Sequence, residues 1–192
     1  MSENWRKLKT NLGQKMRLWR QYKRDDTGAT AVEFAIVGIP FVFALIGLIE
    51  VSLMYAANSL LQDSTSSAAR LIRTGQVQQN IDNPEAMFRD ELCNIASVFL
   101  DCNRIQYEVI SLDGGFADVE STPPMFDNDG NLMSQGFSPG GVNDVVLIRT
   151  VYFFPLMTPL IGSLLADGPN QTKFMMSTAV FQTEPYEFVA GP

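Results

Sequence analysis

The hydrophobic and polar positions of the chain first predict one long helix. Residues 34–49 (FAIVGIPFVFALIGLI) form an apolar run of 16 residues without a charge, inside the wider apolar stretch 29–57. Beyond it, apolar residues recur at near-helical spacing up to Arg73, where Gly75 is a typical stop signal. The apolar positions are Leu53, Ala57, Leu60, Leu61, Ala68, Leu71 and Ile72, with Gln62, Asp63, Ser64, Ser66 and Ser67 mostly opposite. The pattern predicts a helix over 29–74, about 68 Å long.

Further elements follow after a short break. A second helix is predicted over 84–100, where Asn83 can cap the start and Pro84 suits the first position. Three segments rich in β-branched and aromatic residues then predict strands at 104–112, 144–154 and 172–183. In the first of them Ile105, Tyr107, Val109 and Ser111 alternate with Gln106, Glu108 and Ile110, which suggests one covered face. Helices followed by strands indicate an α+β fold.

Two segments, 113–143 and 155–165, connect the predicted strands. Residues 113–143 contain 16 Gly, Pro, Asn or Asp in 31 positions, which predicts a long surface loop of the kind that often carries function. Residues 155–165 include the apolar PLMTPLIGSLL, which is either a short core helix or an exposed patch for a subunit contact.

The apolar run is long enough to consider a membrane. Sixteen helical residues span about 24 Å, short of the roughly 30 Å of a hydrocarbon layer. The stretch 29–57 covers the difference if Glu33 and Glu50, which lie near its ends, are tolerated. A buried core helix and a signal peptide are the alternatives, although no clear A-x-A site follows the run.

The charge distribution orients such a membrane segment. The chain has a formal net charge of −7, but residues 1–28 hold eight basic and three acidic groups, while residues 59–192 hold six basic and sixteen acidic ones. Basic residues before the apolar segment predict a cytoplasmic N-terminus. We therefore divide the chain into a basic leader (1–28), a transmembrane segment (29–57) and an acidic head outside the inner membrane (58–192). The acidic head argues against a nucleic-acid binder.

The junction between leader and apolar segment carries a resemblance. Gly28 ends the charged arm, four residues follow, and Glu33-Phe34 open the apolar run. This resembles the type IVb prepilin cleavage motif G-x-x-x-x-E-[YF]. The wider run GATAVEFAIVGIPFVFALIGLIEVSLMY is similar to the N-terminal segment of the TadE/TadG-like family, minor pilins or pseudopilins of the tight-adherence (Flp) pilus system. A weaker likeness covers a cysteine pair after a helix, late strands and the ending Glu184-Pro185-Tyr186.

The resemblance implies roles for the matching residues. Gly28 would be the last leader residue, cut by a membrane-embedded prepilin peptidase, and Ala29 the new N-terminus. Glu33 would become the fifth residue of the mature chain and pair with the N-terminal ammonium of a neighbouring subunit, with Phe34 beside it in the assembly segment. An unpaired interfacial Glu33 and an ordinary turn at Gly28 are the alternatives. The implied fold is pilin-like: one helix, half in the membrane and half in the periplasm, packed on a small antiparallel sheet with a second helix.

Three further residues are candidates for structure or assembly. Glu50 either pairs with a basic group of a partner or extends to the periplasmic interface. Cys93 and Cys102 are the only cysteines. In an oxidising periplasm a disulfide is expected, with two free buried thiols as the alternative. On a continuous helix their Cα atoms would lie about 13.5 Å apart, so the chain must fold back near Leu100 for the bond to form.

The residue inventory favours a structural subunit over an enzyme. The absence of histidine excludes Ser-His-Asp and Cys-His mechanisms, and two cysteines alone make a metal site unlikely. We predict no catalytic residue, cofactor or metal. The predicted function is a processed minor pilin in pilus initiation or assembly, with the inner membrane, the prepilin peptidase, other minor pilins and the major Flp pilin as partners. The alternative is an uncleaved, membrane-anchored periplasmic assembly factor of the same system.

Overall fold

A computed structural model describes residues 28–80, 82–127 and 133–186 of the chain. The predicted leader, apart from Gly28, lies outside the described residues. The chain divides between Leu48 and Ile49 into two compact units, and each is described by itself below. The helices are α2 (Ala29–Arg73), α3 (Gln76–Gln79), α4 (Pro84–Ala96) and α5 (Pro159–Leu165), and the strands are β1 (Gln106–Leu112), β2 (Val145–Pro155) and β3 (Thr172–Gln182).

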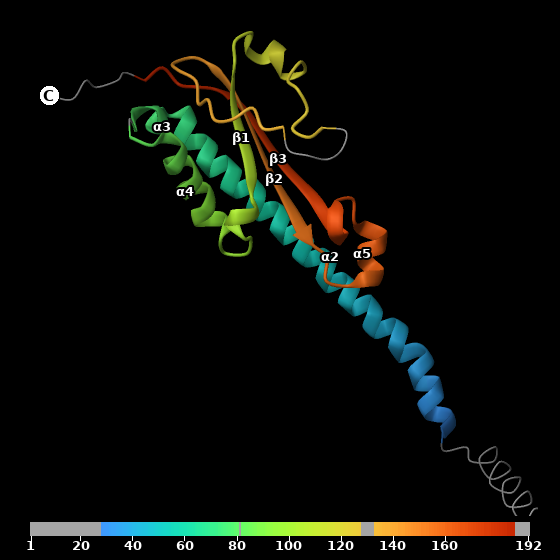
Figure 1. Ribbon diagram of the computed structural model, residues 1–192. Helices are drawn as coiled ribbons and strands as arrows, with labels where there is room; N and C mark the ends of the chain where they lie inside the picture. The colour runs from blue at the N-terminus through green and yellow to red at the C-terminus, as the bar shows by residue number, and fades with distance from the viewer. Residues whose placement is uncertain (1–27, 81, 128–132, 187–192) are drawn as a thin grey trace, which may run out of the picture. The chain divides into compact units, whose positions relative to one another are not determined.

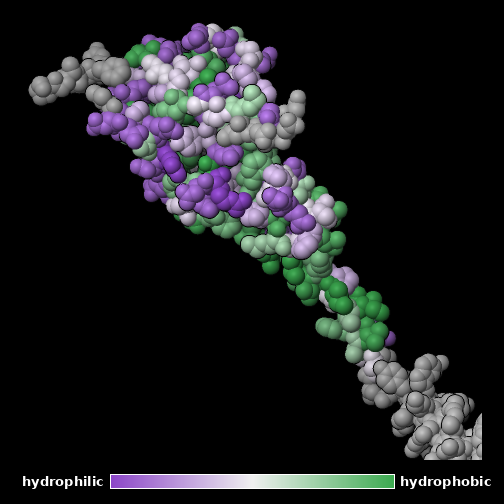
Figure 2. Space-filling view, viewed as in Figure 1, coloured by the Kyte–Doolittle hydropathy of each residue, from purple (hydrophilic) through white to green (hydrophobic). Residues whose placement is uncertain are grey.

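The first unit contains the beginning of α2, and its side chains are apolar and exposed. Hydrophobic residues cover this part of the helix on the face seen in Figure 2. Phe34 is 77% exposed, and Val37, Ile39 and Leu48 are similarly open. A helix that is hydrophobic around its surface and buried by nothing within its own unit is typical of a membrane segment.

The second unit is built on a three-stranded antiparallel sheet in the order β1-β2-β3 (Figure 1). Val109 of β1 lies opposite Ile148 of β2, and Thr150 of β2 lies opposite Ser177 of β3. The long connection between β1 and β2 contains the 113–143 loop, and α5 lies in the connection between β2 and β3. A long helix packed on a small antiparallel sheet confirms the predicted α+β class.

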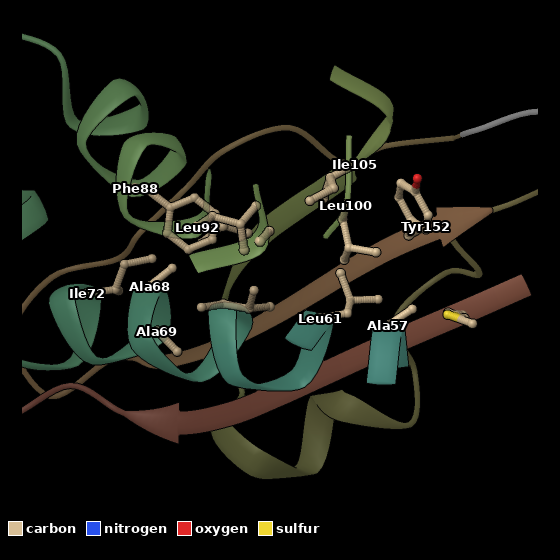
Figure 3. Packing of buried hydrophobic residues seen from close by; sticks show 14 of the residues in the cluster. Ala57, Leu61, Ala68, Ala69, Ile72, Phe88, Leu92, Leu100, Ile105 and Tyr152 are labelled. Carbon is tan, nitrogen blue, oxygen red and sulfur yellow. The ribbon is translucent and has the colours of Figure 1, made fainter. Parts of the chain in front are cut away.

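The core of this unit forms where α2 and α4 meet one face of the sheet. Figure 3 shows Ile72 and Ala68 of α2 turned toward Phe88 and Leu92 of α4. The fully buried members include Ala57, Leu61, Ala68, Ile72, Phe88, Leu92, Val109, Val146 and Ile148. Burying each of the Val, Leu, Ile and Phe side chains in this set contributes about 1.5–3 kcal/mol. The near-helical spacing seen after residue 53 therefore marks the face of α2 that holds the head together.

One polar position of α2 was placed on the wrong face by the sequence pattern. Ser64 was expected opposite the apolar stripe, but it is fully buried and donates a hydrogen bond to the Leu61 carbonyl at 3.0 Å. The neighbouring Thr65 is also buried, and its hydroxyl lies 2.5 Å from that of Thr150 on β2. Small hydroxyl side chains satisfied by backbone and by each other fit the close approach of helix and sheet.

The second helix is shorter than predicted. Asn83 caps α4 by accepting from the Ala86 amide at 3.0 Å, but the helix ends at Ala96 rather than at Leu100. Residues 97–100 continue as turns, and a short 3-10 helix over Cys102–Arg104 delays the start of β1 to Gln106. The chain thus folds back, and Cys93 and Cys102 form a disulfide with their Cα atoms 5.6 Å apart. Closing this small loop contributes about 2.7 kcal/mol in the chain-entropy view.

The end of α2 is fixed by the C-terminal segment of the described chain. Arg73 donates to Glu184 Oε1 through Nη2 at 2.9 Å and through Nε at 3.0 Å. The Glu184 amide donates to the Arg73 carbonyl at 2.8 Å. Gly75 follows with φ +77°, and the ring of Tyr186 lies where a β-carbon at Gly75 would be. Glu184 and Tyr186 therefore hold the C-terminal segment of the described chain against the end of α2.

Replacing Gly75 with alanine is expected to destabilise the head. The substitution places a side chain at a left-handed φ, which costs about 1–2 kcal/mol, and it also forces the Tyr186 ring to move. Gly136 is the matched control, because it has φ +88° but nothing within 4 Å of an added Cβ. Denaturant unfolding monitored by near-UV circular dichroism should show a larger loss for Gly75→Ala than for Gly136→Ala. Equal losses would mean that the Tyr186 contact is unimportant.

The second face of the sheet carries an ion pair that the alternation in β1 did not indicate. Glu108 was expected on an uncovered face, but it is fully buried, and its carboxylate pairs with the Arg149 guanidinium of β2. The 113–143 loop covers the pair: the Gln135 amide donates to Glu108 Oε2 at 3.0 Å, and Arg149 donates to the Pro123 carbonyl at 2.8 Å. The described parts of this loop are thus anchored on the sheet.

Candidate functional site

The predicted cleavage site lies at an accessible start of a helix. Gly28 is exposed, and no atom lies within 4 Å of a β-carbon built on it. Helix α2 begins at the next residue, Ala29. A peptide bond that precedes a helix and has open space around it is reachable by a protease. The sequence motif and the helix boundary therefore meet at the same bond.

Glu33 and Phe34 lie in the second turn of α2, and both are exposed. The Phe34 ring lies along the helix next to Gly38, with its Cε1 3.4 Å from a β-carbon built there. For Glu33, no hydrogen bond or ion pair joins the side chain to another described residue. An exposed carboxylate beside an apolar helix surface has surroundings that favour pairing with a cation. The geometry leaves both residues available for a contact outside the chain.

The apolar part of α2 has the length and exposure of a membrane segment. Among the described residues one helix, Thr30–Arg73, is long and apolar enough to cross a membrane. Its most apolar window has a mean hydropathy of 2.5, and none of that window is buried within the protein. A core helix would bury this surface, so the alternative of a buried core helix does not fit. The helix is consistent with membrane anchoring.

Glu50 is built into the second unit in a way that the sequence did not indicate. It is only 5% exposed although it follows directly after the apolar run. Its Oε1 accepts hydrogen bonds from the backbone amides of Met157 and of Thr158, the latter at 3.1 Å. Its Oε2 is also screened from solvent. Two amide donors stabilise the buried carboxylate, so Glu50 fixes the start of α5 against α2.

Glu50 therefore has an intrachain role. The predicted pairing with a basic group of another subunit stays a prediction, and such a group would reach the carboxylate only if α5 moved. The sequence pattern could not predict this contact, because it joins residues 50 and 157, which are 107 positions apart.

The sequence predicted either a short core helix or an exposed apolar patch for residues 155–165, and the segment has features of both. Residues Pro159–Leu165 form helix α5, and Ile161 and Gly162 are buried against the head. Met157 and Leu164 are nevertheless 80% and 79% exposed, and Leu160 is 57% exposed. Leu160 and Leu164 share one face of α5 at helical spacing, and Met157 lies two residues before the helix. The segment is thus a short helix that also presents an apolar patch.

The cysteine pair and the acidic groups serve structure in the described chain. The disulfide joins the end of α4 to the turn before β1. Tyr107 donates to Glu85 Oε1 at 3.1 Å, and burial together with the Glu85 charge raises the pKa of Tyr107 to about 12. Asp167 accepts from Lys173 Nζ and from the Phe174 amide, and these bonds lower its pKa against the opposing effect of burial. These groups tie neighbouring elements together.

Comparison with known proteins bears on the junction described above. A family model described as TadE-like protein matches residues 28–70. Residues 28–70 are a TadE-like segment. The match begins at Gly28 and ends within the last turn of α2, so it covers the apolar run and the part of the helix packed in the head. No curated protein matches the chain. No solved structure matches it either.

The TadE-like match confirms the family resemblance deduced from the junction. It implies a role in the Tad pilus system, in a family of structural and assembly proteins. Together with the exposed apolar helix it supports membrane association. The matched region contains Gly28, Ala29, Glu33, Phe34 and Glu50. The contacts of the head, such as Glu108 with Arg149, lie outside it.

Proposed function

We propose that the chain is a minor pilin of a type IVb tight-adherence pilus, processed after Gly28 and acting in pilus initiation or assembly. The observation that carries the proposal is the coincidence of three features at one bond: the G-x-x-x-x-E-F motif, the start of α2 and the start of the TadE-like match. The proposed topology has the N-terminus in the cytoplasm, one crossing of the inner membrane and the head in the periplasm. The proposed partners are the prepilin peptidase, other minor pilins and the major Flp pilin.

The chemistry of processing creates the group that assembly requires. Hydrolysis of the Gly28–Ala29 bond leaves a carboxylate on Gly28 and an ammonium on Ala29. The leader takes its +5 charge away, and the mature chain of 164 residues keeps −12 in side chains. The new ammonium lies at the start of an apolar helix, where a charge needs a partner. Glu33 of a neighbouring subunit is the proposed partner.

Intact mass measurement of the protein extracted from membranes tests processing. The native strain should yield a chain that begins at Ala29, whereas a strain lacking the prepilin peptidase should yield one that begins at Met1. The same protein should appear in filaments sheared from the cells. A chain with an intact Met1, found only in the membrane of the native strain, would instead identify an uncleaved assembly factor.

Substituting Glu33 with glutamine is expected to reduce co-assembly without affecting the fold. The side chain is exposed, and no hydrogen bond or ion pair joins it to another described residue, so the head should unfold at the same denaturant concentration. Breaking an ion pair in an apolar environment costs about 3–5 kcal/mol, and each 1.4 kcal/mol corresponds to tenfold in association. The amount of chain recovered with other pilins after crosslinking should therefore fall at least about tenfold.

The control for this experiment is Glu120→Gln, which removes the same charge from an exposed position of the head. It should leave recovery at the native level. If both variants fall equally, net charge and not the position of Glu33 governs assembly.

A further inference from the structure

The chain contains a second apolar surface next to the end of its membrane run. Leu160 and Leu164 lie four residues apart on α5, Met157 lies two residues before the helix, and all three are more than half exposed. The opposite side of α5 packs on the head through Ile161. The patch is small, and it is formed by two residues of a short helix and by one residue of the connection that leads into it.

The position of this patch along the membrane normal is set by Glu50. The uncharged run ends at Ile49, and Glu50 is the next residue of α2. Because Glu50 accepts the amides of Met157 and Thr158, the start of α5 lies at the level of residue 50. Figure 1 shows α5 beside α2 in this part of the second unit. The exposed leucines are one to two turns from that point.

The length of the apolar run, compared with the thickness of a bilayer, indicates where residue 50 lies relative to the lipid. Residues 34–49 span about 24 Å as a helix, and a hydrocarbon layer is roughly 30 Å thick. The layer therefore reaches beyond one end of the run unless the bilayer thins. At the outer end Glu50 would meet it, but its carboxylate is buried and Oε1 accepts hydrogen bonds from two amides, so this charge is not presented to the lipid. Tyr55, which is exposed five residues later, is typical of an interface.

We infer that α5 lies in the outer interface of the bilayer and inserts Met157, Leu160 and Leu164 among the phospholipids, as a second membrane contact beside the transmembrane helix. The inference rests on the membrane anchoring contained in the proposed function. Its occupant is the phospholipid surface, because the start of α5 is bonded to Glu50, the residue that directly follows the uncharged run in the sequence. In this arrangement the charge of Glu50 is buried within the head, and the hydrogen bonds of Glu50 set the depth of α5 in the bilayer.

The experiment is depth-dependent quenching of an environment-sensitive fluorophore in the full-length chain reconstituted in phosphatidylcholine and phosphatidylglycerol vesicles. The chain has two cysteines and they form the disulfide, so an introduced thiol is labelled alone. The reporters are Leu164→Cys and Leu160→Cys, both at exposed positions where cysteine leaves the core intact. Val42→Cys reports the membrane run, and Gln79→Cys reports an exposed site at the other end of the head.

A nitroxide on the lipid near the glycerol should quench the probes at 164 and 160 several-fold more than the probe at 79, with emission shifted to the blue. Quenching at 42 with none at 164 and 160 would overturn the inference and leave the membrane anchor intact. No quenching at 42 by a second nitroxide, placed near the ends of the acyl chains, would show that the anchor itself, and with it the proposed topology, is wrong. A blue shift at 164 that grows with protein density and resists the lipid quencher would also overturn it, because the patch would then contact another copy of the chain.

Discussion

Replacing Gly28 with alanine is expected to leave the protein at its full length of 192 residues in cells that contain the prepilin peptidase. Glycine lets the backbone enter a narrow cleft without a side chain, and a methyl group at this position obstructs the approach. We expect nearly complete loss of the chain that begins at Ala29. Intact mass measurement of the membrane-extracted protein separates the two species.

The structure makes this substitution a clean test. An added Cβ at Gly28 meets nothing within 4 Å, and the residue does not have the positive φ that restricts alanine. Gly28→Ala should therefore fold like the native chain, and a loss of processing reports on recognition by the peptidase. Gly13→Ala is the matched control, because it makes the same change within the leader but outside the motif. It should be processed normally.

Two results would contradict the expectation. Normal removal of the leader from Gly28→Ala would place the cut elsewhere or show that the peptidase accepts a methyl group. Equal loss for Gly13→Ala would mean that the leader as a whole, and not the junction, determines processing.

Replacing Arg149 with methionine is expected to destabilise the head by about 3–5 kcal/mol, because it leaves the carboxylate of Glu108 buried without its cation. Glu108 is fully buried, and the Arg149 side chain is only 12% exposed. Unfolding by urea in detergent solution, monitored by near-UV circular dichroism, measures the change. For a domain of this size, a loss of this magnitude is a large part of the total stability.

Two comparisons isolate the cause. Lys173→Met breaks an ion pair with Asp167 whose partners are 32% and 48% exposed, and it should cost no more than about 1 kcal/mol. The double variant Glu108→Leu with Arg149→Met removes both charges and should recover much of the stability lost by Arg149→Met alone. If the double variant is as unstable as Arg149→Met, lost packing and not the unpaired charge is responsible.

The same variant tests how the long loop is held. Arg149 donates to the Pro123 carbonyl, and Glu108 accepts from the Gln135 amide, so the ion pair fastens the loop at two places. Hydrogen exchange at Gln135 should therefore rise in Arg149→Met before the sheet itself exchanges. Unchanged exchange there would show that the backbone contacts of Val109 with Gly136 and Ser138 are sufficient.

The local elements of this protein were readable from its residues. Apolar periodicity predicted α2 to within about one residue, since its end at Arg73 is followed by Gly75 with φ +77°. The Asn83-Pro84 pair indicated the start of α4, and the TadE-like match over residues 28–70 confirms the family resemblance that the Gly28–Phe34 junction indicated. These features depend on backbone preference and on spacing within a few residues, which a sequence contains directly.

The long-range features were decided only by the tertiary structure. Alternation in β1 placed Glu108 on an uncovered face, because nothing local shows that Arg149 and the loop will cover it. Likewise, the sequence left Glu50 either to pair with a partner or to extend to the interface, whereas its bonds to the amides of Met157 and Thr158 join residues more than 100 positions apart. A buried charge is tolerated only where the fold brings it a partner. The sequence alone thus determined the long helix and its TadE-like segment, whereas the partners of the buried charges required the assembled head.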